Sequence, residues 1–143
     1  MKFLAVALLF FTHSVFAFET TRINFRINSN LDFGGRAYYN CDSVEAQAES
    51  MLEKLGAEGV SVSCRGGLDP WGGFSTEAFV SATFDAPITG ALQTVEFRGF
   101  QGCHLAKEIF NGVRKSFQIM DVQGLRSCSR SSDGYRFNVS VIK

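Results

Sequence analysis

The chain has 143 residues, of which 45% are hydrophobic and 20% are charged, so it contains enough apolar sequence for one hydrophobic core. It has 14 Lys and Arg residues and 14 Asp and Glu residues, which gives a formal net charge of zero, and no run of like charges occurs. Nucleic acids and anionic membrane surfaces attract proteins through clustered basic charge. The neutral balance therefore argues against both as the main partner.

The first 17 residues have the features of a secretory signal peptide. Lys2 gives a positive start, a wholly apolar run follows, and Ala17 ends the segment with a small residue. We predict cleavage between Ala17 and Phe18, with residues 18–143 as a single mature domain in a secreted or periplasmic location. The apolar run is about half as long as a membrane span requires, so we expect no span after cleavage. A retained N-terminal anchor is the less favoured alternative.

The first half of the mature chain begins with a strand and a helix. Residues 21–28 alternate between apolar and polar side chains, which is typical of a strand with one buried face. After a polar, Gly-rich loop, apolar residues at helical spacing predict a helix. Asp42 has the character of its N-cap, with Glu45 as a capping-box partner, and Gly56 is suited to the position just after its C-terminus.

Two further strands complete this half. Residues 60–65 and 76–85 alternate again, and the turn-rich residues 66–75 connect them. Residues 87–90 contain a proline and a glycine and predict a turn, at which we place the boundary between the two halves.

The second half repeats the order. Residues 94–100 are predicted to be extended, and an apolar stripe over residues 105–113 predicts a helix whose buried face is wider than that of the first. Residues 119–128 and 135–142 predict two strands, joined by a hairpin turn over residues 129–134.

A short motif supports reading the halves as copies. The pattern Arg-x-aromatic-x-x-Cys begins at Arg36 and again at Arg98, and a Ser-Cys pair follows the predicted helix of each half. We interpret the chain as a tandem repeat of two βαββ units, about residues 18–88 and 89–143. The predicted fold class is α+β, with an antiparallel sheet of about six strands and two helices on one face. In the alternative, which the sequence leaves open, each half forms its own small sheet and the two halves pair edge to edge.

All four cysteines follow the predicted signal peptide, and an exported chain enters a compartment in which thiols pair. Four cysteines allow three pairings, and the repeat favours Cys41–Cys64 with Cys103–Cys128. A zinc site is the alternative, but zinc ligands commonly come as close C-x-x-C pairs, and the sequence has none. We therefore expect no metal and no other cofactor.

His104 is the only histidine of the predicted mature chain, so it is the natural candidate for a general base or a metal ligand. A base needs a nucleophile or a second acid beside it, and no serine lies in a G-x-S-x-G context. A structural role near the start of the helix is favoured, and we assign no catalytic residue.

Trp71 is the only tryptophan and lies in the Gly-rich residues 66–75, where the two halves differ most. Tryptophan often anchors recognition, and segments added to a scaffold often carry function. We name Trp71, Asp69 and Phe74 as candidate binding residues. In the alternative, Trp71 folds back over the glycines and covers an edge of the core.

Two sets of arginines have weaker claims. Arg36 and Arg98 recur before their cysteines and could form a paired anion site, and Arg126, Arg130 and Arg136 form a mild basic cluster around the last predicted turn. Arginine stems commonly cover apolar surface while the guanidinium pairs with a nearby carboxylate. We favour that structural interpretation for the first set and a solvated hairpin for the second.

These features favour a secreted or periplasmic, disulfide-stabilised binding or interaction module without catalysis. Its expected partner is another secreted or envelope protein, with no nucleic acid involved. The main alternative is a small extracytoplasmic enzyme that uses His104 with a carboxylate. A structural subunit of an envelope assembly, which pairs through its sheet edges, is a third possibility. The sequence does not indicate an oligomeric state.

Overall fold

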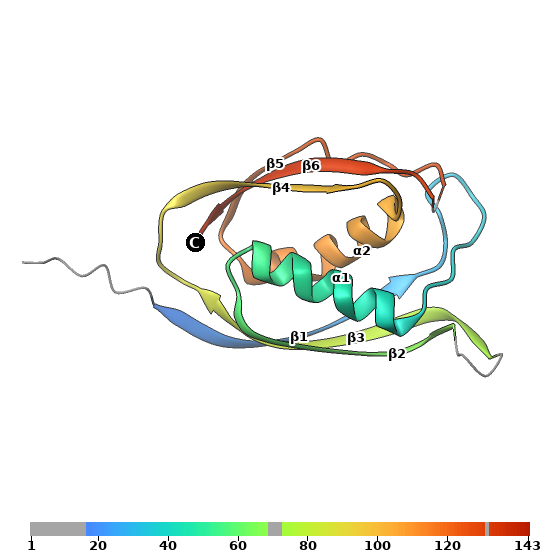
Figure 1. The fold of residues 1–143 in the computed structure, drawn as a ribbon, viewed down its shortest axis with the longest axis horizontal. Coiled ribbons are helices and arrows are strands. Elements are labelled where there is room, and N and C mark those ends of the chain that lie inside the picture. Colours follow the sequence, from blue (N-terminus) through green and yellow to red (C-terminus); the bar gives the residue numbers. More distant parts are fainter. Residues whose placement is uncertain (1–16, 69–72, 131) are drawn as a thin grey trace, which may run out of the picture.

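A computed structural model of the chain describes residues 17–68, 73–130 and 132–143 (Figure 1). The α+β class, the six strands and the two helices expected from the sequence are all confirmed. In chain order the elements are β1 (Phe18–Asn28), α1 (Cys41–Lys54), β2 (Glu58–Leu68), β3 (Phe74–Pro87), β4 (Leu92–Gly99), α2 (Cys103–Val113), the 3-10 helix η1 (Arg114–Ser116), β5 (Ile119–Gln123) and β6 (Tyr135–Ile142).

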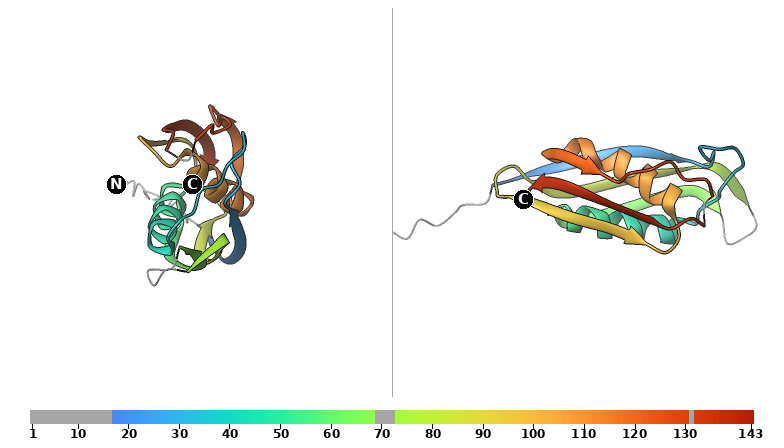
Figure 2. Two further views of the ribbon diagram at one scale, coloured as in Figure 1. Left: turned by 90° about the vertical axis from the view of Figure 1, so that its right-hand side faces the viewer. Right: turned by 90° about the horizontal axis from the view of Figure 1, so that it is seen from above.

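The six strands form two antiparallel sheets of three strands each, with the orders β1-β3-β2 and β4-β6-β5. The single sheet of the first prediction is therefore replaced by the alternative in which each half makes its own. The halves do not join edge to edge, however, because α1 and α2 lie between the two sheets (Figures 1 and 2). Both halves have the same order of elements and the same strand order, as a duplicated unit would; the duplication itself stays a hypothesis.

The wide apolar stripe of α2 explains this arrangement. Seven of its residues are buried, and a helix that is apolar over so much of its circumference needs cover on more than one side. A sheet above and a sheet below provide that cover. The buried residues form one continuous core with members from both sheets and both helices, including Val80, Leu52, Ile109 and Phe137.

The alternation in β1 and β3 sets their pairing. The two strands pair along the whole of β1, from Phe18 opposite Pro87 to Asn28 opposite Glu77. Alternate residues then point to the same face, so Val80, Ala82 and Phe84 of β3 are all buried under the helices.

The start of α1 differs from the prediction. The helix begins at Cys41, and its N-cap is Asn40, whose side chain accepts a hydrogen bond of 2.8 Å from the Ser43 backbone N–H. Asp42 lies in the first turn instead. Glu45 does not close a capping box, because its carboxylate accepts a 2.7 Å bond from the Cys64 N–H and so links α1 to β2. Gly56 does follow the helix, with a φ of 97° that suits glycine.

The prediction for residues 119–128 was too long. β5 ends at Gln123, because Gly124 has a φ of 83° and takes the chain out of the extended conformation. Residues 124–130 and 132–134 form a connection of irregular structure.

The structure contains the disulfides Cys41–Cys64 and Cys103–Cys128, which are the pairs that the repeat favours. Each disulfide links the first residue of a helix to a cysteine that comes later in the same half of the chain. Both disulfides lie at the same end of the molecule, together with residues 29–40, 99–102, 124–130 and 132–134 (Figure 1). We call this the loop end; residue 17 and the C-terminus lie at the opposite end.

Candidate functional site

The loop end collects the connections that follow β1, β4 and β5, and both helices start there (Figure 1). Binding residues are commonly found on connections that a rigid scaffold holds in place. Three groups of contacts fix the connections of this end, and a depression lies among them.

The first group is a buried tyrosine–histidine pair. His104 is the second residue of α2 and only 2% of it is exposed. Its Nδ1 lies 2.8 Å from the hydroxyl oxygen of Tyr39, and the two rings are nearly parallel, with 6.0 Å between their centroids. Burial raises the pKa of Tyr39 to about 12, and the negative charge of Glu108 adds to this, so the phenol stays neutral. The pair joins the connection of the first half to the helix of the second.

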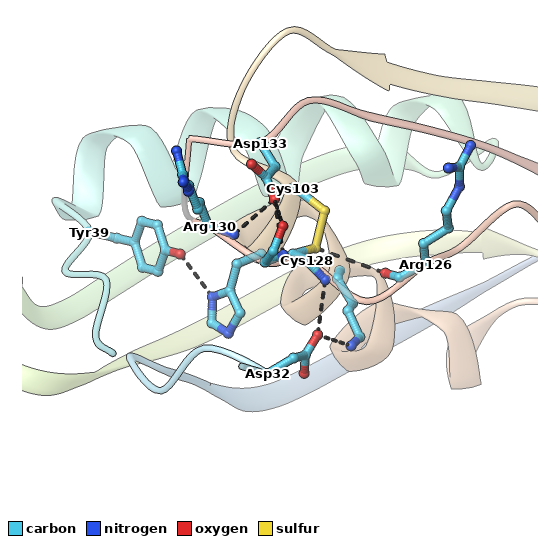
Figure 3. Close-up of polar contacts among 10 residues, drawn as sticks. Asp32, Tyr39, Cys103, Arg126, Cys128, Arg130 and Asp133 are labelled. Carbon is cyan, nitrogen blue, oxygen red and sulfur yellow. Dashed lines mark hydrogen bonds and ion pairs between the residues drawn. A yellow bond between two sulfur atoms is a disulfide. The ribbon is translucent and has the colours of Figure 1, made fainter. Parts of the chain in front are cut away.

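The second group surrounds Asp32 (Figure 3). One carboxylate oxygen, Oδ2, accepts a 2.7 Å bond from Nζ of Lys107 and a 3.1 Å bond from the Cys128 N–H. The Lys107 bond, followed by the Cys128 bond, lowers the pKa of Asp32 from its ordinary value. Asp32 therefore fastens the connection after β1 to α2 and to a disulfide of the second half.

The third group shapes residues 124–134 from within. Oδ2 of Asp133 accepts bonds from the Ser129 N–H at 2.9 Å, from the Ser129 hydroxyl at 2.7 Å and from the Arg130 N–H at 2.8 Å. The Ser129 hydroxyl bond, followed by the Arg130 bond, lowers the pKa of Asp133. Its carbonyl oxygen accepts a 2.9 Å bond from the Cys103 N–H at the start of α2. This irregular connection is thus held at Asp133 and at the disulfide.

A depression of about 680 Å³ opens between this connection and the end of β4. Phe100 lies at its wall with its side chain fully exposed, and the buried Cys103 and Phe137 line it from the core side. The other lining residues are Gly99, Gly124, Leu125, Arg126, Ser127, Ser129, Asp133, Gly134, Tyr135 and Arg136. A volume of this size is in the range of sites that bind small molecules or a few side chains.

The depression is lined by two arginines, Arg126 and Arg136, and by one carboxylate, that of Asp133. Arg136 makes a 2.7 Å ion pair with Glu96, and Arg98 approaches the same carboxylate at 3.7 Å. Arg126 and Arg130 are exposed, and neither has an ion pair with another residue in the part of the chain that the structure describes. Figure 3 shows their side chains on either side of the Cys103–Cys128 bridge.

The binding residues named from the sequence are not tested by this geometry. Trp71 and Asp69 lie outside the described residues. Phe74 begins β3, but its side chain also lies outside the described part. β2 ends and β3 begins at the loop end (Figure 1).

The other candidates have structural contacts. His104 bonds to Tyr39 and does not line the depression. Arg36 is exposed on the first half, and Arg98 pairs with Glu96, so no contact joins the two recurring arginines. Among the described residues, no three His, Cys, Asp or Glu side chains gather as metal ligands.

Sequence reasoning missed Asp32, Asp133 and Phe100. Phe100 occupies the aromatic position of the repeated motif, which suggested scaffold rather than surface. Asp133 follows Ser129 at four residues, in a Ser- and Gly-rich stretch that is typical of side chain–backbone turns, and this signal could have been used. Asp32 carries no such signal, because its partners are 75 and 96 residues away.

None of the helices in the described part of the chain is long and apolar enough to span a membrane. Comparisons with protein-family models, curated proteins and solved structures find no match to this chain. The function therefore has to be argued from the loop end itself.

Proposed function

We propose that the protein is an exported, non-catalytic binding module, and that its binding surface is the loop end. The observation that carries the proposal is the depression beside Phe100, whose walls are an irregular connection fixed by a disulfide and by Asp133. Phe100 is fully exposed, and aromatic side chains are common anchors in protein interfaces.

The disulfides support the cellular setting of this proposal. Two bridges and no free cysteine among the described residues fit a protein that resides outside the reducing cytoplasm. We propose that residues 1–17 direct export and are then removed, as their composition predicts. The enzyme alternative has less support, because His104 is buried and bonded to Tyr39 rather than directed into the depression.

Affinity capture tests the proposal. The wild-type protein, Phe100→Ala and a control variant, Met120→Ala, are immobilised and exposed to the extracytoplasmic fraction of the source cells. Met120 is a matched control because it is an exposed apolar residue, 69% accessible, on β5 and outside the depression. A Trp71→Ala variant examines the neighbouring segment in the same experiment.

We expect one protein to be retained by the wild type and by Met120→Ala, and to be lost with Phe100→Ala. Loss of a single well-buried aromatic anchor typically weakens an interface by about 2 kcal/mol or more, which is over tenfold in affinity. Retention that is equal for all three proteins, or no retention by the wild type, would contradict the loop end as a binding surface.

A further inference from the structure

We infer that the depression at the loop end binds an acidic peptide segment of a partner protein, with a carboxylate on Arg126 and a neighbouring apolar side chain against Phe100. This inference rests on the proposed function and adds the chemistry of the ligand to it.

The cation comes from Arg126. It lines the depression, its side chain is exposed, and no described carboxylate forms an ion pair with it. Figure 3 shows its guanidinium directed away from Asp32 and Asp133, the two carboxylates of the cluster. These two carboxylates accept hydrogen bonds from Lys107 and from Ser129, and neither forms an ion pair with Arg126. A planar guanidinium with free donors binds a carboxylate by two parallel hydrogen bonds.

The apolar contact comes from Phe100. It lines the same depression as Arg126 but belongs to the connection after β4, and its side chain is fully exposed. Gly134 packs against the backbone beside the ring, because a Cβ atom built on it would lie 3.0 Å from the Gly99 carbonyl oxygen and 3.2 Å from that of Phe100. A ligand that places an apolar residue next to an acidic one can therefore contact both anchors at once.

The positions of both anchors are fixed before binding. The Cys103–Cys128 bridge, the three bonds to Asp133 and the bond from Cys128 to Asp32 hold the connection that carries Arg126. A surface that is already ordered loses less conformational entropy on binding than a flexible one. A short peptide, which itself must be ordered, gains most from such a surface.

An acidic peptide segment of a partner protein fits the depression better than an anionic membrane does. Membrane adsorption requires a broad basic face, whereas here the Arg98 and Arg136 charges share Glu96 and the whole chain is neutral. The site is also concave, which suits side chains that enter it more than a flat lipid surface.

The test uses isotope-labelled protein and three probes. The first is an acetylated, amidated pentapeptide of four glutamates around one phenylalanine, the second is the same peptide with glutamine in place of glutamate, and the third is a vesicle of phosphatidylcholine with anionic phosphatidylglycerol. Amide chemical shifts report the binding position, and the salt concentration is raised from about 20 mM to about 200 mM to screen charge.

We expect the glutamate peptide to shift amides within residues 99–103 and 124–136, and the glutamine peptide to bind at least about tenfold more weakly. Arg126→Gln should lose about tenfold, Arg126→Lys should lose less, and Arg22→Gln on β1 should match the wild type. Phe100→Ala should weaken both peptides. Each variant is first checked for an unchanged unfolding midpoint.

Equal binding of the two peptides, shifts outside these residues, or binding by the vesicle and not by the peptide would overturn the inference. If Phe100-dependent capture of a partner succeeds while the glutamate peptide does not bind, the acidic ligand is wrong and the binding module stands. If capture also fails, both are wrong.

Discussion

Gly112 of α2 packs against Phe25 of β1, and this contact between the two halves gives a prediction with a defined sign. A Cβ atom built on Gly112 lies 2.8 Å from Cε2 of Phe25 in β1 and closer still to Cγ and Cδ2 of that ring. Cγ is the root of the ring, so rotation about the last side-chain bond does not relieve the overlap. We therefore expect Gly112→Ala to destabilise the protein.

Two opposing effects set the magnitude. In an exposed helix interior, replacing glycine with alanine stabilises by about 1 kcal/mol. Overpacking against a side chain that cannot move freely costs about 1–3 kcal/mol. The second effect is larger here, so the net loss in the free energy of unfolding should be about 1 kcal/mol.

The assay is urea unfolding of four proteins that form a double-mutant cycle: wild type, Gly112→Ala, Phe25→Ala and the double variant. Without the ring, Gly112→Ala should stabilise by about 1 kcal/mol, so its effect changes sign between the two backgrounds. Asn111→Ala, an exposed position in the same helix, provides the control for helix propensity alone. The same stabilisation in both backgrounds would refute the packing of α2 on β1.

Two further predictions concern the contacts that tie the halves together at the loop end. Tyr39→Phe should lower the free energy of unfolding by about 1–3 kcal/mol, because the buried imidazole of α2 loses its partner, and urea unfolding measures this. Because the pKa of Tyr39 is raised from 10.0 to about 12, the free energy of unfolding of the wild type should also fall as the pH rises through that interval. An equal fall in Tyr39→Phe would contradict the raised pKa of Tyr39. Asp32 has a lowered pKa, so its contribution is present above its ordinary value of 3.8 and disappears as the pH falls below it. Asp32→Asn should therefore lose less stability than the wild type during acid titration, and parallel acid profiles would show that the Lys107 bond is not formed in solution.

The local elements could be predicted because their signals are local. The alternation over residues 21–28 and the helical spacing around Leu52 arise from burial of one face, and each is visible within one element. Their ends were less predictable. Asn40 rather than Asp42 caps α1, and because both residue types are good caps, the local sequence did not distinguish between them.

The candidate site was less accessible to sequence reasoning. Phe100 has the appearance of a core residue in the repeated motif. In the structure β4 ends at Gly99 and α2 begins at Cys103, so Phe100 lies in the turn between them, where its side chain is exposed. The sequence identified Arg126 only as one member of a basic cluster. In the structure Glu96 pairs with Arg98 and Arg136, and Arg126 has no carboxylate partner among the described residues.

By itself, the sequence determined the α+β class, the order of strands and helices, and two cysteine pairs consistent with the repeat, because periodicity and spacing are properties of short segments. The tertiary structure decided that the strands separate into two sheets, that both helices lie between them, and that the connections after β1, β4 and β5 meet with the two disulfides at one end. Those features depend on contacts between residues far apart in the chain, such as Asp32 with Lys107 and Gly112 with Phe25, for which the sequence carries no local signal.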